Sequence, residues 1–513
     1  MSLSATAKTS VPTLPEFWAG RYRSCGILVV ITLLTLAVRL PFRHLIDDDE
    51  AFYSLIGLRW LKGALPYVAS YDVKPPLLFA IFAFAQAVFG TSLATIKGLE
   101  IAFTIWGAVS LQRLIEKQGA FSVSLWAGGL FPFLSLSQAG TDSANSLILI
   151  PFVISSFSAL SDAMRSRSFP WQSMSLCGLF IGLAGLVKQI ALFEAIGLAC
   201  FAAWHFRQNK PFQTLACFIA GASLPILGFA AYFALAGHLS DAFNAVVAGA
   251  LARGSLRISA MDDSGLFWIV HFILLVSPLT PLVMASLMAV MKREAILNAF
   301  PAQLFNLASV WAICASLGCL AGHSALRYYG SSLIAPLLIL SGAYVLYLAR
   351  GRGAQSLLII AGSVLATFVC VLWVEKDGLG LTEQTPSDDY KAAQATAVKL
   401  SQLGYTDQDA LLVPRRGEYV FVETKTVPKF RYFHTMHLLC DFPLPVKSPL
   451  ISELASRPKF IVMSEPVLPL NCENPEYQKL ISATLKDDYS LAGVVQGQWG
   501  KSLIYRVNPL GSR

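Results

Sequence analysis

The chain has 513 residues, of which 55% are hydrophobic and 14% are charged. Its mean hydropathy is +0.58 and its formal net charge is +8. This composition excludes a mainly soluble architecture and is typical of a polytopic membrane protein. The basic residues fall mostly in short loops, which favours a role in topology and contact with anionic lipids. The sequence has no concentrated basic face with aromatic platforms, so we expect no nucleic-acid partner.

Most of the apolar runs reach the length that a membrane helix needs, roughly 17–25 residues. We interpret the first run as a retained signal anchor. The exception in length is PPLLFAIFAFAQAVFG, Pro75 to Gly90, which begins with two prolines. We expect this short run to lie in the interface or to re-enter the membrane, which leaves about eleven membrane helices. In chain order the runs are 25–41, 76–90, 95–112, 121–138, 143–161, 173–187, 190–205, 213–236, 266–291, 302–321, 329–349 and 355–374.

The positions of the basic residues predict which loops face the cytoplasm. With residues 76–90 not spanning, each short cytoplasmic loop carries two basic residues, and Arg21 and Arg23 precede the first span. The loops 42–94 and 237–265 and the residues after about 375 then lie on the opposite side. The basic pairs are Arg113/Lys117, Arg165/Arg167, Arg207/Lys210, Lys292/Arg293 and Arg350/Arg352.

Three regions follow from this pattern: a cytoplasmic N-terminus at 1–24, a transmembrane domain at 25–374, and an outward-facing domain at 375–513. The last region alternates helical and strand patterns and is large enough for its own core. It predicts a small α/β domain, with a helix near 387–403 and strands at 410–414, 459–463 and 502–507. Of nine cysteines, only Cys440 and Cys472 lie in this polar region, so a disulfide between them stays open.

The chemistry-bearing stretch is the first loop, from Asp47 to Leu77. It opens with the acidic run Asp47-Asp48-Asp49-Glu50 directly after the first span. Asp72 and Lys74 then precede Pro75-Pro76, which restrict the backbone to extended conformations. The loop therefore presents carboxylates and a lysine at a membrane surface. The alternative is that these charges only mark the end of a helix and meet lipid headgroups.

Other ionisable residues lie on the same predicted side, at the ends of different spans. Asp142 could simply cap a helix, Lys188 could snorkel at a helix end, and Arg327 could anchor the interface. Their convergence with the acidic loop indicates a site, because ionisable groups at membrane depth are costly. Carboxylates can accept a proton from an acceptor hydroxyl, and cations can stabilise a departing phosphate. This combination favours glycosyl transfer from a lipid-linked sugar phosphate.

The motifs Asp49-Glu50-Ala51-Phe52-Tyr53 and Tyr71-Asp72-Val73-Lys74-Pro75-Pro76-Leu77 resemble the first-loop signature of the GT-C membrane glycosyltransferases. The branch that the chain is similar to contains the protein O-mannosyltransferases, the lipid A aminoarabinose transferases and rhizobial galacturonosyltransferase-like proteins. Thr141-Asp142 and the run Gly182 to Gln189 extend the resemblance. It implies an inverting transfer, on the extracytoplasmic face of a bacterial inner membrane, from a polyprenyl-phosphate sugar to an envelope acceptor.

The resemblance also implies roles for individual residues. Asp49 matches the essential first-loop aspartate, Glu50 matches its neighbour, and Asp142 matches a second acidic position. Lys74 and Lys188 match residues near the donor phosphate. Asp48 leaves the choice of base ambiguous by one residue. Some relatives carry Arg or His where this chain has Phe52, and Arg59 could supply the contact that is then missing. Arg327 is a third candidate for binding the phosphate. The candidates for other substrate contacts are Tyr53, Asp72 and His323.

Several alternatives remain open at this point. The resembling branch works without a catalytic metal, so we predict no required cofactor, although residues 47–50 with Asp142 could hold a divalent cation. The loop 237–265, with Asp241, Arg253, Arg257, Asp262 and Asp263, is either a mobile gate or an ordinary interfacial segment. Competing functions are a secondary transporter or glycolipid flippase, and a scaffold. The sequence does not identify the sugar, the oligomeric state or the acceptor, which could be lipid A or lipopolysaccharide core, another glycan, a lipid or a protein.

Overall fold

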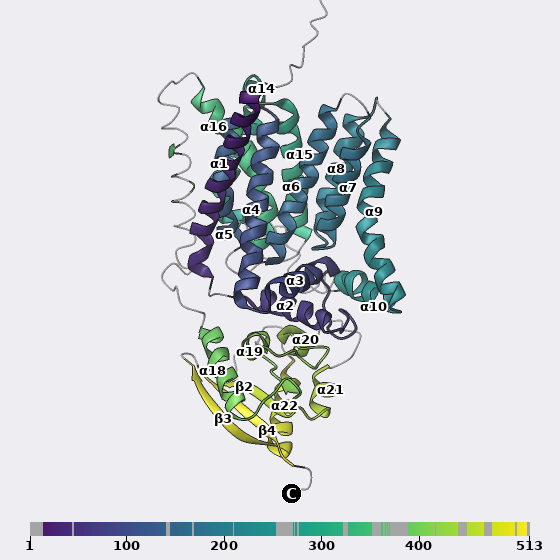
Figure 1. The fold of residues 1–513 in the computed structure, drawn as a ribbon, viewed down its shortest axis with the longest axis vertical. Helices are drawn as coiled ribbons and strands as arrows, with labels where there is room; N and C mark the ends of the chain where they lie inside the picture. Colours follow the sequence, from purple (N-terminus) through teal and green to yellow (C-terminus); the bar gives the residue numbers. More distant parts are fainter. Residues whose placement is uncertain are drawn as a thin grey trace, which may run out of the picture.

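A computed structural model shows a bundle of long helices with an α/β unit against one end (Figure 1). In the membrane part, Asp142, His323, Arg253, Arg257, Asp262 and Asp263 lie outside the residues that the structure describes, and so do Cys440 and Cys472 in the C-terminal region. The structure describes residues 14–43, 46–139, 144–166, 169–208, 210–252, 270, 272–273, 276–321, 327–350, 361–362, 365, 367, 369, 388–415, 417–439, 449–465, 474–497 and 500–509.

The bundle contains both long helices and shorter ones. Six of the described helices are long and apolar enough to cross a membrane: Tyr22–Phe42, Leu93–Lys117, Ser146–Arg165, Pro211–Leu235, Ala302–Ala321 and Tyr328–Ala349. Five shorter apolar helices accompany them. In chain order the helices are α1 (Leu14–Arg39), η1 (Leu40–Phe42), α2 (Asp48–Leu61), α3 (Pro76–Phe89), α4 (Leu93–Lys117), α5 (Phe121–Ala139), α6 (Ala144–Arg165), α7 (Trp171–Gly185), α8 (Ala191–His205), α9 (Pro211–Leu235), α10 (Leu239–Phe243), the π-helix η2 (Asn244–Gly249), η3 (Ser277–Leu279), α13 (Thr280–Met291), α14 (Arg293–Leu297), α15 (Ala302–Ala321), η4 (Arg327–Leu333) and α16 (Ile334–Ala349).

Two short helices form the first loop. Figure 1 shows α2 and α3 lying across the end of the upright helices, between the bundle and the C-terminal unit. α3 has 14 residues and begins after Pro75, whose extended backbone cannot continue a helix. The predicted short run at 76–90 is therefore a helix that lies at the end of the bundle.

Burial separates the centre of the bundle from its periphery. In the most apolar stretch of α6, 78% is buried inside the protein, whereas in that of α9 only 17% is buried. Phe212 and Leu235 of α9 are almost fully exposed. α9 therefore presents its apolar surface outward, where lipid would cover it. On its inner side it packs closely on α7, because a Cβ added at Gly178 would lie 1.9 Å from the carbonyl oxygen of Phe218. Only glycine allows this approach.

The C-terminal unit is built on a four-stranded sheet with strand order β1-β2-β4-β3. β1 pairs with β2 in parallel, and the other pairs are antiparallel. The structure has a helix and three strands where the sequence predicts them, as α18, β1, β2 and β4. The sequence did not predict β3, which contains two glycines and a register shift between Leu491 and Gly493. The elements are α18 (Asp388–Gln402), β1 (Leu411–Leu412), α19 (Gly417–Thr424), α20 (Thr435–Leu439), α21 (Pro449–Ala455), β2 (Phe460–Glu465), α22 (Pro475–Asp488), β3 (Tyr489–Gly497) and β4 (Gly500–Val507).

Candidate active site

The acidic run at the start of α2 separates into carboxylates with different surroundings. Asp47 is the N-cap: its Oδ2 accepts a hydrogen bond of 3.1 Å from the backbone N–H of Asp49, and with Glu50 it forms a capping box. Asp48 accepts a hydrogen bond from the hydroxyl of Tyr419 in the C-terminal unit. The side chain of Asp49 is 30% exposed and faces His434, with 4.0 Å between Oδ1 and Nε2.

Glu50 belongs to a buried ion network that joins three helices. Lys97 of α4 lies 2.6 Å from Oε2 of Glu50 and 2.7 Å from Oε1 of Glu100. Arg39, at the end of α1, lies 3.5 Å from the second oxygen of Glu100. Burial raises the pKa of Glu50 well above its ordinary value. The network fixes the first turn of α2, and with it the position of Asp49, against the bundle.

Hydrogen bonds to backbone carbonyl groups fix the segment around Lys74 and hold it against the turn between α7 and α8. The N–H of Leu77 donates to the carbonyl of Leu186 at 3.0 Å, and Nε2 of Gln189 donates to the carbonyl of Val73 at 2.6 Å. The hydroxyl of Tyr67 donates to the carbonyl of Lys74 at 2.8 Å. These contacts bring together two stretches, 71–77 and 182–189, that are separated by more than a hundred residues.

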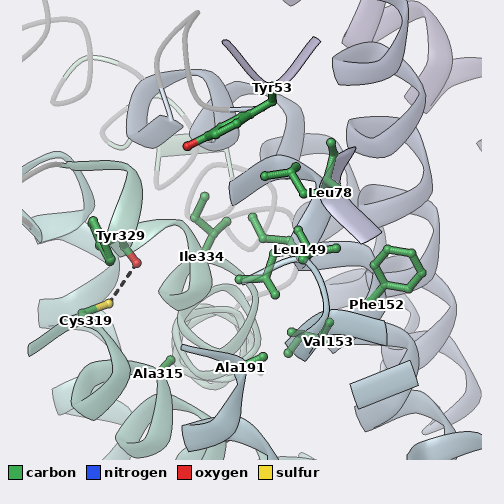
Figure 2. Packing of buried hydrophobic residues seen from close by; sticks show 14 of the residues in the cluster. Tyr53, Leu78, Leu149, Phe152, Val153, Ala191, Ala315, Cys319, Tyr329 and Ile334 are labelled. Carbon is green, nitrogen blue, oxygen red and sulfur yellow. Dashed lines mark hydrogen bonds between the residues drawn. The ribbon is translucent and has the colours of Figure 1, made fainter. Parts of the chain in front are cut away.

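Lys188 lies in that turn and is 1% exposed. Its ammonium group donates to Oγ of Ser146 at 3.1 Å and lies 4.0 Å from the centre of the Tyr329 ring and 4.6 Å from that of Tyr328. Asp49 and Lys74 are close enough for their charges to act on it. Figure 2 shows Tyr329 packed in the buried hydrophobic cluster, with its carbonyl accepting a hydrogen bond from Sγ of Cys319. A partly exposed carboxylate and two lysines therefore meet at one end of the bundle.

Three of the other predicted residues have structural contacts. Arg59 is 8% exposed and donates to the carbonyl of Phe430 at 2.6 Å; burial lowers its pKa to about 10. Tyr53, which Figure 2 shows among the buried hydrophobic residues, is 2% exposed, and its ring centre lies 6.0 Å from that of Phe79 and 6.5 Å from that of Phe82. Asp72 is 3% exposed and accepts from the backbone N–H of Val73 at 2.7 Å.

The remaining predicted residues are described in part or not at all. Asp142 and His323 lie outside the described residues, and the structure places Arg327 only as the first residue of η4. In the loop predicted as a gate, α10 and η2 are described, and Asp241 pairs with His238 at 2.9 Å. Across the described ranges, no group of three or more His, Cys, Asp or Glu side chains is arranged to hold a metal ion.

The sequence interpretation missed the contribution of the C-terminal unit. His434 packs against Phe52 of α2, with ring centres 4.6 Å apart, and its Nε2 lies 3.9 Å from Oε1 of Glu418. Glu418 is fully buried, and burial, with Asp48 nearby, raises its pKa to about 8. A signal was present in FRYFHTMH, residues 430–437, where aromatic and histidine side chains are unusually dense for a soluble α/β unit.

Comparison with known proteins gives no match among protein-family models or curated proteins. Among solved structures, ArnT from Cupriavidus metallidurans bound to undecaprenyl phosphate is similar, with a TM-score of 0.63 and 13% sequence identity over 96% of this chain and 99% of that one. The Archaeoglobus fulgidus oligosaccharyltransferase in complex with Zn and sulfate has a TM-score of 0.52 and 13% identity, covering 85% of this chain and 68% of that one. The predicted fold class is thereby confirmed: this chain is a polytopic helical membrane protein with a C-terminal α/β unit, and its fold is similar to that of ArnT.

Proposed function

We propose that this protein is an inverting membrane glycosyltransferase that moves a sugar from a polyprenyl-phosphate donor to an acceptor hydroxyl. The observation that carries the proposal is that hydrogen bonds hold the segment around Lys74 against the turn that carries Lys188, at the end of the bundle where α2 presents Asp49 (Figure 1). A fold shared with a protein that binds undecaprenyl phosphate supports the lipid-linked donor. The alternative functions, a transporter or a scaffold, do not require this grouping.

In the proposed reaction the acceptor oxygen attacks the anomeric carbon while its proton passes to the carboxylate of Asp49. The bond between the anomeric carbon and the phosphate oxygen breaks, and the electron pair leaves with the polyprenyl phosphate. Lys74 and Lys188 stabilise the charge that develops on that phosphate. Because attack and departure occur on opposite sides of the sugar, the configuration at the anomeric carbon inverts.

The ion pairs at the other end of the bundle support an outward-facing site. Arg23 pairs with Glu116 at 2.6 Å, Lys117 pairs with Asp162 at 2.7 Å, and Arg165 donates to the carbonyl of Lys117. Figure 1 shows α14, which follows Lys292, at the end opposite α2 and α3. Because short cytoplasmic loops are rich in Lys and Arg, the first loop and the C-terminal unit are proposed to face the periplasm.

The acceptor is proposed to be a component of the cell envelope, either a glycan, a glycolipid or a protein. The partly exposed Asp49 lies on the first loop and faces the C-terminal unit, so the acceptor would approach from the aqueous side. The donor would arrive from the bilayer, on the side of Lys188 and the buried helices. Membrane lipids are thus both surroundings and the source of one substrate.

The test compares envelope glycolipids and glycans by mass spectrometry in cells that carry the wild-type protein, no protein, or an Asp49→Asn variant at equal abundance. We expect one defined sugar to disappear in the last two, because loss of a general base slows transfer by about 10²–10⁴-fold. Asp47→Ser is the matched control, since serine also caps helices and should preserve the sugar.

The possible results of this test distinguish between the proposed function and its alternatives. A sugar lost without the protein but retained with Asp49→Asn would contradict the role of Asp49 and move the base to Asp48. Glycans that are identical in all strains would contradict glycosyl transfer and favour transport.

A further inference from the structure

The C-terminal unit is fastened to the first loop close to His434. The N–H of Tyr71 donates to the carbonyl of Arg431 at 3.0 Å, and the guanidinium of Arg431 donates to the carbonyl of Tyr67 at 2.7 Å. Arg59 reaches the carbonyl of Phe430 from α2. These three bonds, which involve residues 430 and 431, fix the start of the segment that carries His434.

The imidazole of His434 lies between two carboxylates from distant parts of the chain. Its Nε2 is 4.0 Å from Oδ1 of Asp49 and 3.9 Å from Oε1 of Glu418. Both distances are too long for a hydrogen bond but are within reach of an ion pair when the imidazole is protonated. The ring is held against Phe52 and lies 5.1 Å from the ring of His437.

The surroundings of Glu418 indicate that the residues around His434 have a role beyond packing. Its Oε1 accepts from the backbone N–H of Thr435 at 3.2 Å, which orients the carboxyl group toward the start of α20. Within the part of the chain that the structure describes, its buried Oε2 has no hydrogen-bond partner. Leaving a buried carboxyl oxygen without a donor is costly, and folding alone gives no reason to retain it.

We propose that His434 is a positioning residue, supplied by the C-terminal unit, that holds the Asp49 carboxylate in place and orients it for the acceptor. This inference rests on the proposed function and adds to it, because it assigns the C-terminal unit a part in the active site. The titratable groups around the imidazole are Asp48 and Asp49 of α2, Glu418 of α19 and His437 of α20. The carboxylate of Asp49 favours the imidazolium form of His434, and the imidazolium can in turn hold Asp49 through an ion pair.

The first experiment measures sugar transfer by the full-length protein in nanodiscs as a function of pH, once the donor is known. His434→Gln should lower kcat/KM tenfold or more near neutral pH. It should also move the acidic limb of the pH profile to higher pH, because the base loses a neighbouring positive charge and is protonated more easily. His437→Gln, three residues further along the chain in α20, is the matched control and should leave that limb in place.

A second experiment does not depend on turnover. Exchange of the imidazole C2 proton, followed by mass spectrometry, gives the titration midpoint of each histidine in the intact protein. The midpoint of His434 should fall in Asp49→Asn, which removes a neighbouring negative charge, whereas that of the distant His238 should not change. Asp49→Asn is nearly isosteric, so this arm remains available if His434→Gln does not fold.

The two proposals can fail separately. If the wild-type protein transfers sugar but His434→Gln leaves the pH profile unchanged, the role of His434 is contradicted and the proposed function stands. If no sugar is transferred, the exchange experiment alone decides: a lowered His434 midpoint in Asp49→Asn retains the pairing, and an unchanged midpoint overturns it.

Discussion

Lys188 is a cation that the protein keeps almost completely away from water. Burial disfavours an ammonium ion, and the hydrogen bond to Ser146 together with the rings of Tyr328 and Tyr329 offsets part of that cost. A serine and two aromatic rings carry no formal negative charge at neutral pH. The site therefore retains positive charge with which to attract a phosphate, and this property gives the first prediction.

Lys188→Met should fold but bind undecaprenyl phosphate about 10–100-fold more weakly, because a hydrogen bond to a charged group contributes about 1.5–3 kcal/mol. The measurement is a titration of the purified protein in nanodiscs with undecaprenyl phosphate, followed by native mass spectrometry. Ser146→Ala retains the charge and is the control, with a smaller expected loss. Equal affinities of Lys188→Met and the wild-type protein would exclude Lys188 from the donor site.

For single residues, the sequence predicts which residue types form the site better than it predicts the role of each one. The run Asp47 to Glu50 indicates a cluster of carboxylates, but a helix cap, a tyrosine contact and a buried ion pair are all compatible with the same letters. The roles depend on Lys97, Tyr419 and His434, which come from three other elements. No local pattern predicts those long-range partners.

At the scale of the elements, the ion network between α1, α2 and α4 connects the bundle to the site. Lys97 lies between Glu50 and Glu100, and Arg39 approaches Glu100 from the other side. Lys97 donates to both carboxyl groups in a buried place, so its removal leaves Glu50 without this donor and Glu100 with one cation fewer. This makes Lys97 the residue whose loss should loosen α2.

Lys97→Met should destabilise the protein by about 3–5 kcal/mol, the cost of breaking a buried ion pair. Unfolding by denaturant in detergent micelles, followed by tryptophan fluorescence, measures the change. The double variant Lys97→Met/Glu50→Gln should recover part of the loss, because Arg39 still faces Glu100 and a neutral amide at position 50 loses less than a carboxyl group when the ammonium is absent. Simple additivity of the two changes would argue against the network.

Hydropathy predicts helices where they are long and places their ends within a few residues, as for α9 and α15. It also separates α3 from the longer helices, because the two prolines and the short length are local properties. β3 was missed for a physical reason: its glycines and register shift interrupt the alternation by which a strand is recognised.

At the scale of the whole molecule, the contact between the first loop and the C-terminal unit could not be predicted from either part alone. Composition identifies a membrane part and an α/β unit, and basic loops predict that the two share a side of the membrane. The docking itself depends on single polar contacts, such as Tyr71 with Arg431 and Asp48 with Tyr419. The residues that make these contacts lie in segments whose sequences are typical of ordinary loops and helices.

Two carboxyl groups at this contact should make the stability of the protein depend on pH. Burial raises the pKa of Glu418 to about 8 and that of Glu453, beside Arg59, to about 7. Both values lie above the ordinary value near 4.5, so the folded protein binds more protons than the unfolded chain between that value and about pH 8. The stabilising effect is complete below about pH 4.5 and is lost as the pH rises through 7 to 8.

We therefore expect the melting temperature of the detergent-solubilised protein to fall between pH 5.5 and pH 8.5, and the fall to be smaller in the double variant Glu418→Gln/Glu453→Gln. Glutamine keeps the size of the protonated side chain but does not titrate, so it removes the pH dependence without opening a cavity. Glu476→Gln is the control, because Glu476 is exposed and pairs with Lys479 on the surface of α22. A fall of equal size in the double variant would mean that other groups control the contact. A smaller fall would show that protons bound at this contact help to hold the C-terminal unit on the first loop.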